Sequence, residues 1–521
     1  MVYFSILQFQ SACLNGKNYR KRMQNLIWGI ITVVVSSFVF WYAWKSFKNG
    51  NEKLAVLLLI LGGVILRVFI STDFYLHEWD ERYHALVAKH LINSPLKPML
   101  YSDPLMPFDF REWAGNHIWM HKQPLTLWGL ALSLWLFGVN EIALRLPSIL
   151  LTTLGIWLTF KIAKELFNSR VAFLSAFLFA IHGLILEVTG GRVATDHVDV
   201  FFLVFIELAI YYSILFFKRK RVLFNVLAGV FVGFAILSKW LPALIVLPLW
   251  ILLAIHFKRY SIKLLVTNLV ILIVAFIAIA APWQWYAIHN FPDEYFWEST
   301  YNMLHLTTVL GDQGGSWFYH FNKMRINYGE LIYLPIIWLL YQTFTNKNIA
   351  KYWILVIWIF VPYLFFSFAA TKMQGYTLFS APAIFIVTAL FWDNLSGMKN
   401  KWKYDFLRKL IMFLLIALPV RFAIERLKPF ELRDRNPVWV KDIKSLNRFD
   451  EYEQKVVFNM DRNIEAMFYT NFIAYQAIPS AVDIKEIQNL GYQVYVINEG
   501  VIPDEIREIE NVQIINLELP D

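Results

Sequence analysis

Long apolar runs separated by short polar segments fill most of the chain and predict membrane-spanning helices. A helix needs about 20 mostly apolar residues to cross a bilayer. The runs lie at about residues 26–44, 54–71, 124–139, 145–162, 171–188, 199–217, 222–237, 241–256, 263–281, 328–343, 352–369, 377–392 and 406–423. This pattern is typical of a polytopic α-helical membrane protein with about 11–12 transmembrane helices.

One run, 124–139, is predicted to lie along the membrane instead of crossing it. Its sequence, PLTLWGLALSLWLFGV, is short for a span and rich in Trp and Leu, as helices at a membrane interface often are. When this run is not counted as a span, the basic residues between spans gather on one side, which the positive-inside rule makes the cytoplasm. Those residues are Lys45, Lys48, Lys53, Lys161, Lys164, Arg170, Lys218 to Arg221, Lys258, Arg259, Lys347, Lys351, Lys399 and Lys401.

The same topology places the chemically varied loops on the outer face. They are the long loops 72–144 and 282–327, the loop 189–198, two short turns around Lys239 and Lys372, and the C-terminal tail. The run 26–44 is the exception, because it places the basic residues 20–22 outside. A start at Met23 in place of Met1 would remove most of this conflict. We therefore expect a multi-pass protein of the inner (cytoplasmic) membrane with its active site facing the periplasm or the outside.

Three regions follow from the pattern. Residues 1–53 are an N-terminal segment with one extra transmembrane helix, and residues 54–423 are the transmembrane core. After residue 424 the segments KVVFNM and VQIINLEL read as strands, whereas IEAMFYT reads as a helix. The alternation predicts a small extracytoplasmic α/β domain over residues 424–521.

Composition agrees with a membrane location and argues against nucleic acid as a partner. The chain of 521 residues is 58% hydrophobic, with a mean hydropathy of +0.47. Its 21 tryptophans, 25 tyrosines and 45 phenylalanines suit the two membrane–water interfaces. The net charge of +9 is explained by the cytoplasmic loops. A single cysteine, Cys13, excludes an internal disulfide.

The first outer loop opens with the octet HEWDERYH, which carries the strongest candidate chemistry. If a helix begins near residue 78, Asp80 and His84 share one face, and Glu81 and Arg82 are their neighbours. Two neighbouring carboxylates can divide the work of taking a proton and orienting an acceptor. The structural alternative is a polar helix start whose acids are favoured by the helix dipole.

Further candidates lie on the same outer rim. Lys122, in HKQPLTLW, precedes a proline that can open the interfacial helix, so it either meets a phosphate at headgroup level or snorkels. His121, with the acids of the first loop, could bind a divalent metal ion, although there is no tight ligand spacing. Asp196, beside Arg192, begins a span and could instead form a simple surface ion pair.

Two lone lysines and one histidine complete the set. Lys239 and Lys372 each lie in a short outer turn between apolar runs. Because they oppose the positive-inside trend, an anionic partner is indicated. The loop 282–327 is dense in aromatic residues that suit sugar rings or lipid, and it contains His305 as a possible ligand or acid/base group. A lone histidine is more often a hydrogen-bonded structural residue.

Six motifs, taken in order, resemble the dolichyl-phosphate-mannose-protein mannosyltransferase-like family, which includes the bacterial aminoarabinose transferases that modify lipid A. The first is the acidic pair Asp80 and Glu81. The others are HKQPLTLW with FGVNEIALRLPS, TDHVDVFF, GFAILSKWLPAL, PWQWYA and FSFAATKMQGYTLFSAPA. The resemblance covers about residues 54–395. Each motif alone is weakly specific, and the shared order makes the resemblance strong.

This resemblance implies a GT-C glycosyltransferase. It would move one sugar from a polyprenyl-phosphate donor to a protein, lipid A or glycan acceptor outside the cytoplasmic membrane, with inversion. Asp80 would be the general base or would place the acceptor hydroxyl, assisted by Glu81, and Lys122 would lie near the lipid phosphate. The other positions matched to the cavity are Arg145, Asp196, Lys239 and Lys372. The supporting residues would be Arg82 and His84.

The chain departs from the family pattern at three lysine motifs. Lys-Gln-Pro-Leu stands in place of Lys-Pro-Pro-Leu, Lys-Trp-Leu-Pro in place of Lys-Gly-Pro, and Lys-Met-Gln-Gly-Tyr in place of Lys-Leu-Pro-His-Tyr. His121 also stands where some members carry an acid. These changes leave open a metal cofactor and the donor sugar, which can be a hexose or a pentose.

Two other classes of function stay open at this point. A transporter or flippase for a lipid-linked substrate would favour inverted repeats and helices broken near the midplane. The sequence shows neither, and its polar groups gather at one rim. A non-catalytic sensor would use the C-terminal α/β domain to bind a partner.

Overall fold

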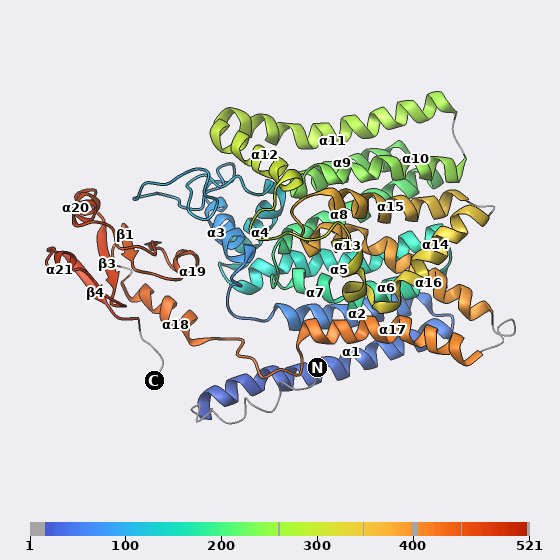
Figure 1. Cartoon of the computed structure of the whole chain (residues 1–521), viewed down its shortest axis with the longest axis horizontal. Helices are drawn as coiled ribbons and strands as arrows, with labels where there is room; N and C mark the ends of the chain where they lie inside the picture. The colour runs from blue at the N-terminus through green and yellow to red at the C-terminus, as the bar shows by residue number, and fades with distance from the viewer. Residues whose placement is uncertain (1–15, 259–260, 347–348, 399–404, 450, 518–521) are drawn as a thin grey trace.

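The protein is a long helical bundle with a small α/β domain at one end (Figure 1). The computed structural model describes residues 16–258, 261–346, 349–398, 405–449 and 451–517. The long helices of the bundle are α1 (Gly16–Lys48), α2 (Glu52–Ser71), α5 (Glu141–Leu166), α8 (Asp196–Arg219), α9 (Val222–Lys239), α11 (Ile262–Asn290), α15 (Ile349–Phe368), α16 (Ala381–Gly397) and α17 (Asp405–Leu427). Shorter members are α6 (Ser169–Ile181), α7 (Gly183–Thr189), α10 (Val246–Phe257), α13 (Tyr319–Tyr328) and α14 (Tyr333–Thr345).

The described residues contain eight helices that are long and apolar enough to cross a membrane, or nine when the pair α6 and α7 is counted as one bent span. This is fewer than the 11 or 12 predicted from the apolar runs. The other runs form helices that are shorter, as in α10 and α14, or more charged, as in α17. The pair α6 and α7 bends by 51° at His182, a break that the sequence pattern did not predict.

Asparagine caps start several of these helices. The side chains of Asn51, Asn140 and Asn168 accept hydrogen bonds from the backbone N–H three residues on, at distances of 3.2, 2.9 and 2.9 Å. Each cap satisfies one of the backbone donors that a helix start leaves without a partner. The local sequence therefore defines where α2, α5 and α6 begin.

The predicted interfacial run forms α4 (Pro124–Phe137). At 14 residues, it spans only about 21 Å, less than the roughly 30 Å of a hydrocarbon core. Leu132, Trp135, Leu136 and Phe137 are exposed along its last turns. These apolar side chains suit a helix that lies against lipid.

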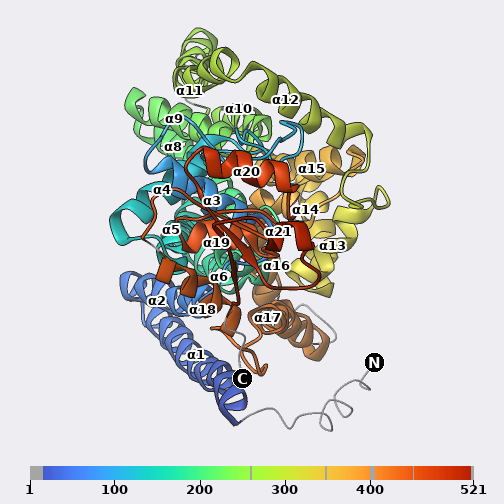
Figure 2. The same ribbon diagram turned by 90° about the vertical axis from the view of Figure 1, so that its left-hand side faces the viewer.

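The α/β domain contains a four-stranded sheet with the order β2-β1-β3-β4, in which all neighbouring strands are parallel. The strands are β1 (Lys455–Phe458), β2 (Ile473–Ala474), β3 (Gln493–Ile497) and β4 (Val512–Ile515). The helices α18 (Val438–Ser445), α19 (Asn463–Tyr469), α20 (Ala481–Asn489) and α21 (Asp504–Arg507) surround them (Figure 2). The predicted mixture of strands and helices in this region is confirmed.

The domain lies against α3 (Asp80–Leu91), the helix that opens the first long loop. Leu86 of α3 and Met467 and Phe468 of α19 belong to one buried apolar cluster. Arg82 lies 3.5 Å from Glu465, and Lys89 donates to the carbonyl oxygens of Met467, Phe468 and Thr470. The two ends of α3 are therefore both attached to the domain.

The segment between α17 and α18 also holds the first helix. Asn25 of α1 donates to the carbonyl oxygens of Lys428 and Glu431 and accepts from Arg435 Nε at 2.6 Å. Gly29 lies directly against Pro429, where any side chain would collide with the backbone. The N-terminal part of α1 thus lies at the same end of the bundle as the α/β domain (Figure 1).

Candidate active site

Asp80 begins α3, and its side chain is partly exposed at the end of the bundle that carries the α/β domain. Its Oδ2 atom accepts a hydrogen bond from the Thr195 backbone N–H at 3.1 Å and lies 3.4 Å from Lys122 Nζ. The Asp80 side chain is 16% exposed and that of Lys122 is 17% exposed. Thr195 has a left-handed backbone, with φ of 61°, which presents its N–H to this carboxylate.

Charge around Asp80 keeps its carboxylate ionised. Burial on its own would raise the pKa of Asp80, but the positive field of Lys122, with His84 and His121, lowers this pKa well below its ordinary value. The N–H of Thr195 acts in the same direction. At neutral pH the site therefore presents a negatively charged oxygen beside an ammonium group.

Glu81, next in sequence, points the opposite way and is fully buried. Arg145 binds both of its carboxylate oxygens, at 2.6 and 2.8 Å, and the His77 backbone N–H donates to it at 2.8 Å. The remaining Arg145 donors bond to the carbonyl oxygens of Ser71, Asp73 and Tyr75.

The expectation that Arg145 lines the cavity is therefore not met by this geometry. Its guanidinium is fully buried, and its hydrogen bonds are used within the protein. Glu81 shares this enclosed position. The pair binds backbone groups of the segment between α2 and Asp80, at Ser71, Tyr75 and His77. It does not face the open site.

Asp196, also expected in the cavity, lies behind Asp80. Its Oδ1 atom is 2.8 Å from His84 Nδ1, and both side chains are fully buried. His84 comes from α3 and Asp196 begins α8, so the contact joins the two helices.

Lys239 extends the polar rim from the end of α9. Its ammonium forms an ion pair with Asp199 of α8 and lies 5.2 Å from the centre of the Tyr376 ring. Gly375 packs so closely that a side chain there would approach the Asp199 carboxylate to 2.4 Å. The turn at Gly375 thus needs a residue without a side chain.

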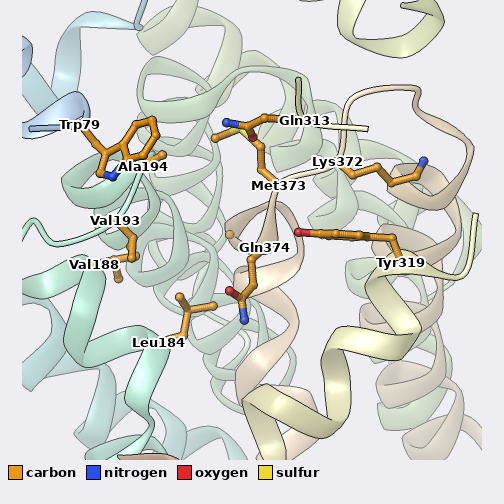
Figure 3. Close-up of a pocket in the computed structure, with 11 residues that line it drawn as sticks. Trp79, Leu184, Val188, Val193, Ala194, Gln313, Tyr319, Lys372, Met373 and Gln374 are labelled. Carbon is orange, nitrogen blue, oxygen red and sulfur yellow. The ribbon is translucent and has the colours of Figure 1, made fainter. Parts of the chain in front are cut away.

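Lys372 lines a small cavity together with Trp79 and Gln374, but its ammonium bonds to the backbone. Its ammonium donates to the carbonyl oxygens of Ser367, at 2.9 Å, and Ala369, at the C-terminal end of α15. A cation at this end of a helix is stabilised by the helix dipole. Figure 3 shows the amine pointing away from Trp79 and Ala194 across the pocket.

The histidines proposed for metal binding are tied to single partners. His121 Nδ1 lies 3.2 Å from Glu298, and the ring stacks on Trp113 at 5.0 Å. His305 Nδ1 bonds to the Tyr301 carbonyl oxygen at 2.9 Å, as in a histidine with a structural role. Burial lowers the pKa of both rings. No group of three or more His, Cys, Asp and Glu that could hold a metal ion occurs in the described ranges.

A small cavity of about 150 Å³ opens beside the Asp80 turn. Its walls come from the Trp79 turn, the end of α7 with the following loop, and the turn before α16 (Figure 3). The lining residues include Trp79, Leu184, Val188, Val193, Tyr319 and Gln374. Most of these surfaces are apolar, which suits a hydrocarbon chain or the carbon face of a sugar.

Three residues of the site were not predicted. Thr195 is the backbone donor to Asp80, the Tyr376 ring contacts Lys239, and Glu298 contacts His121. Asp199, which stands with Asp196 at the start of the same span, pairs with Lys239. Thr195 and Asp199 both lie within the motif TDHVDVFF, which therefore contained a usable signal. The contact of Glu298 with His121 joins the helix α12 (Pro292–Thr307) to the segment before α4, 177 residues away, and has no local signature.

Part of the chain that contributes to the site matches known proteins. Residues 121–285 match the family model for dolichyl-phosphate-mannose-protein mannosyltransferase. A relative is the undecaprenyl phosphate-alpha-4-amino-4-deoxy-L-arabinose arabinosyl transferase of Pseudomonas savastanoi pv. phaseolicola, which is 25% identical over 340 residues. The match covers 61% of this chain and 58% of that relative. The chain therefore matches less than two thirds of the relative's length.

The solved structures agree on the architecture. ArnT from Cupriavidus metallidurans, bound to undecaprenyl phosphate, superposes with a TM-score of 0.59 at 16% identity, covering 84% of this chain and 88% of that one. The apo oligosaccharyltransferase of Archaeoglobus fulgidus gives 0.55 at 15% identity, covering 81% and 64%.

The fold is that of a GT-C glycosyltransferase. The resemblance predicted from six ordered motifs is thereby confirmed, as is the prediction of a multi-pass helical membrane protein. Within this GT-C fold, the first outer loop and the C-terminal α/β domain lie at one end of the bundle (Figure 1).

Proposed function

We propose that the chain transfers one sugar from a polyprenyl-phosphate donor to an acceptor hydroxyl, with inversion, at the outer face of the cytoplasmic membrane. The observation that carries the proposal is the ionised Asp80 carboxylate beside Lys122 at an open rim. A carboxylate can accept the proton of the acceptor hydroxyl, and an ammonium group can bind the lipid phosphate. Relatives named as undecaprenyl phosphate-linked aminoarabinose transferases support the same substrate class.

In the proposed reaction, the acceptor oxygen attacks the anomeric carbon from the face opposite the phosphate. The bond between that carbon and the phosphate oxygen breaks, and its electron pair leaves with the phosphate. The acceptor proton passes to Asp80, and Lys122 stabilises the charge that grows on the leaving phosphate. Attack from the opposite face in one step inverts the configuration.

The pairing of Asp80 with Lys122 couples donor binding to catalysis. Before the donor arrives, Lys122 helps to hold the pKa of Asp80 low, which makes the carboxylate a poor base. A bound phosphate competes for the Lys122 ammonium and adds negative charge near Asp80, so the pKa of this acid rises. Asp80 therefore becomes a better base when the donor is in place.

The names of the relatives favour an aminopentose carried by undecaprenyl phosphate as the donor. Lipid A is the acceptor of the aminoarabinose transferases that the six motifs resemble, and we take it as the first candidate acceptor. A hexose donor, or an acceptor that is a protein or another glycan, would use the same two groups. No described feature favours the transporter alternative, since the polar groups form a site at one end of the bundle.

The decisive experiment replaces Asp80 by asparagine. Asp80→Asn keeps the shape but cannot accept the proton, and general-base catalysis contributes about 100- to 10,000-fold. We expect transfer of 4-amino-4-deoxy-L-arabinose from its undecaprenyl phosphate to lipid A, measured with the purified chain in lipid, to fall by at least about 100-fold. Protein abundance and binding of undecaprenyl phosphate should be kept.

Asp109→Asn is the matched control, because Asp109 is exposed in the same loop and forms an ion pair with the exposed Arg111. It should transfer as the unaltered chain does. If Asp80→Asn retained full transfer, the catalytic assignment would be overturned. If transfer were absent from the unaltered chain too, the same assay with hexose donors would test the wider class.

A further inference from the structure

A second, larger cavity lies between the first outer loop and the α/β domain. Its volume is about 260 Å³. One wall is the last turn of α3 and the segment that follows, a second is the loop near Met99 and Tyr101, and the third is the segment after α19. Lys89, at this end of α3, is nine positions from Asp80, or about 14 Å along the helix.

Polar side chains without a partner in the protein line this cavity. Within the described part of the chain, the side chains of Asn93, Ser94, Ser102 and Asn471 make no hydrogen bond to another residue. Asn93, Ser102 and Asn471 are exposed, and Ser94 is half-buried. They supply both donors and acceptors, and they come from both sides of the contact between loop and domain.

The charged groups of the cavity are already satisfied or neutral. Lys89 donates three hydrogen bonds to carbonyl oxygens of the α/β domain, at 2.7, 3.2 and 2.6 Å. Burial lowers the pKa of His90 to about 4, so this ring is neutral at pH 7. Its Nδ1 atom bonds to the Met99 carbonyl oxygen. What remains is a set of uncharged hydrogen-bonding groups. The rings of Tyr101 and Phe472, which also belong to the lining, are buried, with 5% and 3% of each residue exposed.

We propose that this cavity is a binding site for an uncharged sugar residue of the acceptor. The amides and hydroxyls of the lining match the hydroxyl groups of an uncharged sugar. The volume equals that of roughly eight waters, which is enough for a ring of this kind. The assignment of the sugar to the acceptor rests on the proposed function, while the carbohydrate site itself stands on the cavity.

The location explains why such a site would serve transfer. Asp80 lies at the first turn of α3 and the cavity lies at the last turn, so one rigid helix sets the separation between them. A sugar held at the cavity would place another part of the same oligosaccharide near Asp80. The α/β domain would then contribute directly to the choice of acceptor.

The test measures retention of the purified full chain on a panel of immobilised oligosaccharides, half of them neutral and half acidic. We expect neutral members to retain the chain. Asn93→Ala and Asn471→Ala should each weaken retention about fivefold, the effect of one lost hydrogen bond. Asn489→Ala is the matched control, because Asn489 is exposed on α20 away from the cavity.

Retention that is absent, that is confined to acidic members, or that is unchanged in both cavity variants would overturn the proposal. Binding of undecaprenyl phosphate, measured on the same samples, tests the proposed function separately. If the lipid binds and no sugar does, only the cavity assignment fails. If neutral sugars bind and the lipid does not, the carbohydrate site stands and the donor assignment fails.

Discussion

Asp80 and Glu81 are adjacent acids in opposite environments. Asp80 is partly open and faces Lys122, whereas Glu81 is sealed against Arg145. The two residues begin a helix, and consecutive positions on a helix project about 100° apart. This offset separates a carboxylate that can meet a substrate from one that supports the fold. We therefore interpret Glu81 as a positioning residue.

Removing the charge of Lys122 should make Asp80 a stronger base in the free enzyme. Burial alone raises the pKa of Asp80, and Lys122 is the foremost group that lowers it. In Lys122→Met the pKa of Asp80 rises, so the acid limb of kcat/KM moves to higher pH. The pH profile of transfer measures this shift. Lys97→Met, in the same loop, should leave the limb unmoved; an unshifted limb in Lys122→Met contradicts the coupling.

Loss of the Glu81 charge should damage stability in a way that loss of the Asp80 charge does not. Glu81→Gln leaves the Arg145 guanidinium buried without its counter-charge, and breaking such a pair costs about 3–5 kcal/mol. Thermal unfolding of the detergent-solubilised protein measures the cost. Glu78→Gln is the control, since the Glu78 side chain is 75% exposed. An unfolding temperature equal to the unaltered chain's would show that the pair is not needed.

Sequence reasoning at this scale found the two groups that face the site, Asp80 and Lys122, because both lie near the chain position where an apolar run ends or begins. It did not predict that Arg145, Asp196 and Lys372 turn inward. For Arg145 and Asp196 the partners, Glu81 and His84, are distant in the sequence. The Lys372 ammonium instead bonds to carbonyl oxygens only three to six positions away. A charged residue at a helix end has the same local pattern whether it faces a cavity or the interior.

At the scale of elements, α3 joins the proposed active site to the α/β domain. Arg82 contacts Glu465 near its start, and Lys89 caps the carbonyl oxygens at the end of α19. Apolar residues between them share a buried cluster with the domain. Because Asp80 begins this helix, its position depends on the contacts between α3 and the α/β domain.

Acid should loosen this part of the molecule through two histidines that stay neutral when folded. Burial lowers the pKa of His77 to about 3 and that of His90 to about 4, whereas an unfolded histidine titrates near 6.5. Between these values the unfolded chain binds more protons, so stability falls as the pH drops from about 6.5 towards 4. Unfolding temperatures over this range should fall less steeply for His90→Gln. An identical slope would exclude His90 as a contributor.

The elements themselves were largely predictable. Apolar runs located the long helices, and the short, Trp-rich run became α4, too short to span a membrane as a straight helix. The break between α6 and α7 was not predicted, although the run 171–188 contains His182, Gly183 and Glu187. The bend follows from His182 acting as the cap of a new helix. The periodicity of hydrophobic residues indicates which face of a helix is buried, and it does not show a bend within a helix that is buried on all sides.

The whole molecule is organised around one functional end, where the first loop, α4, the turn at Lys239 and the α/β domain converge (Figure 1). The alternation of short strands and helices after residue 424 predicted the α/β domain, but it did not predict that the domain packs against α3. Its contacts with α3 join residues 378 to 381 positions apart. Pairings over such a distance carry no local signal.

Deleting residues 438–521 should destabilise the core as well as remove a domain. The deletion exposes Leu86 and neighbouring apolar residues of α3 and leaves Lys89 without its carbonyl partners. We expect a lower yield and a broader size-exclusion peak, with little or no transfer. A monodisperse truncated protein that still binds undecaprenyl phosphate but does not transfer would instead assign the domain to acceptor recognition.

The contact of Asn25 with the segment after α17 has a consequence for how the protein is made. Asn25 lies more than 400 positions before its partners Lys428, Glu431 and Arg435, so it is synthesised before any of them. Until they are made, the polar amide of Asn25 and the close-packing surface at Gly29 stay uncovered. Closure of this end of the bundle therefore waits for a segment that is translated long after α1.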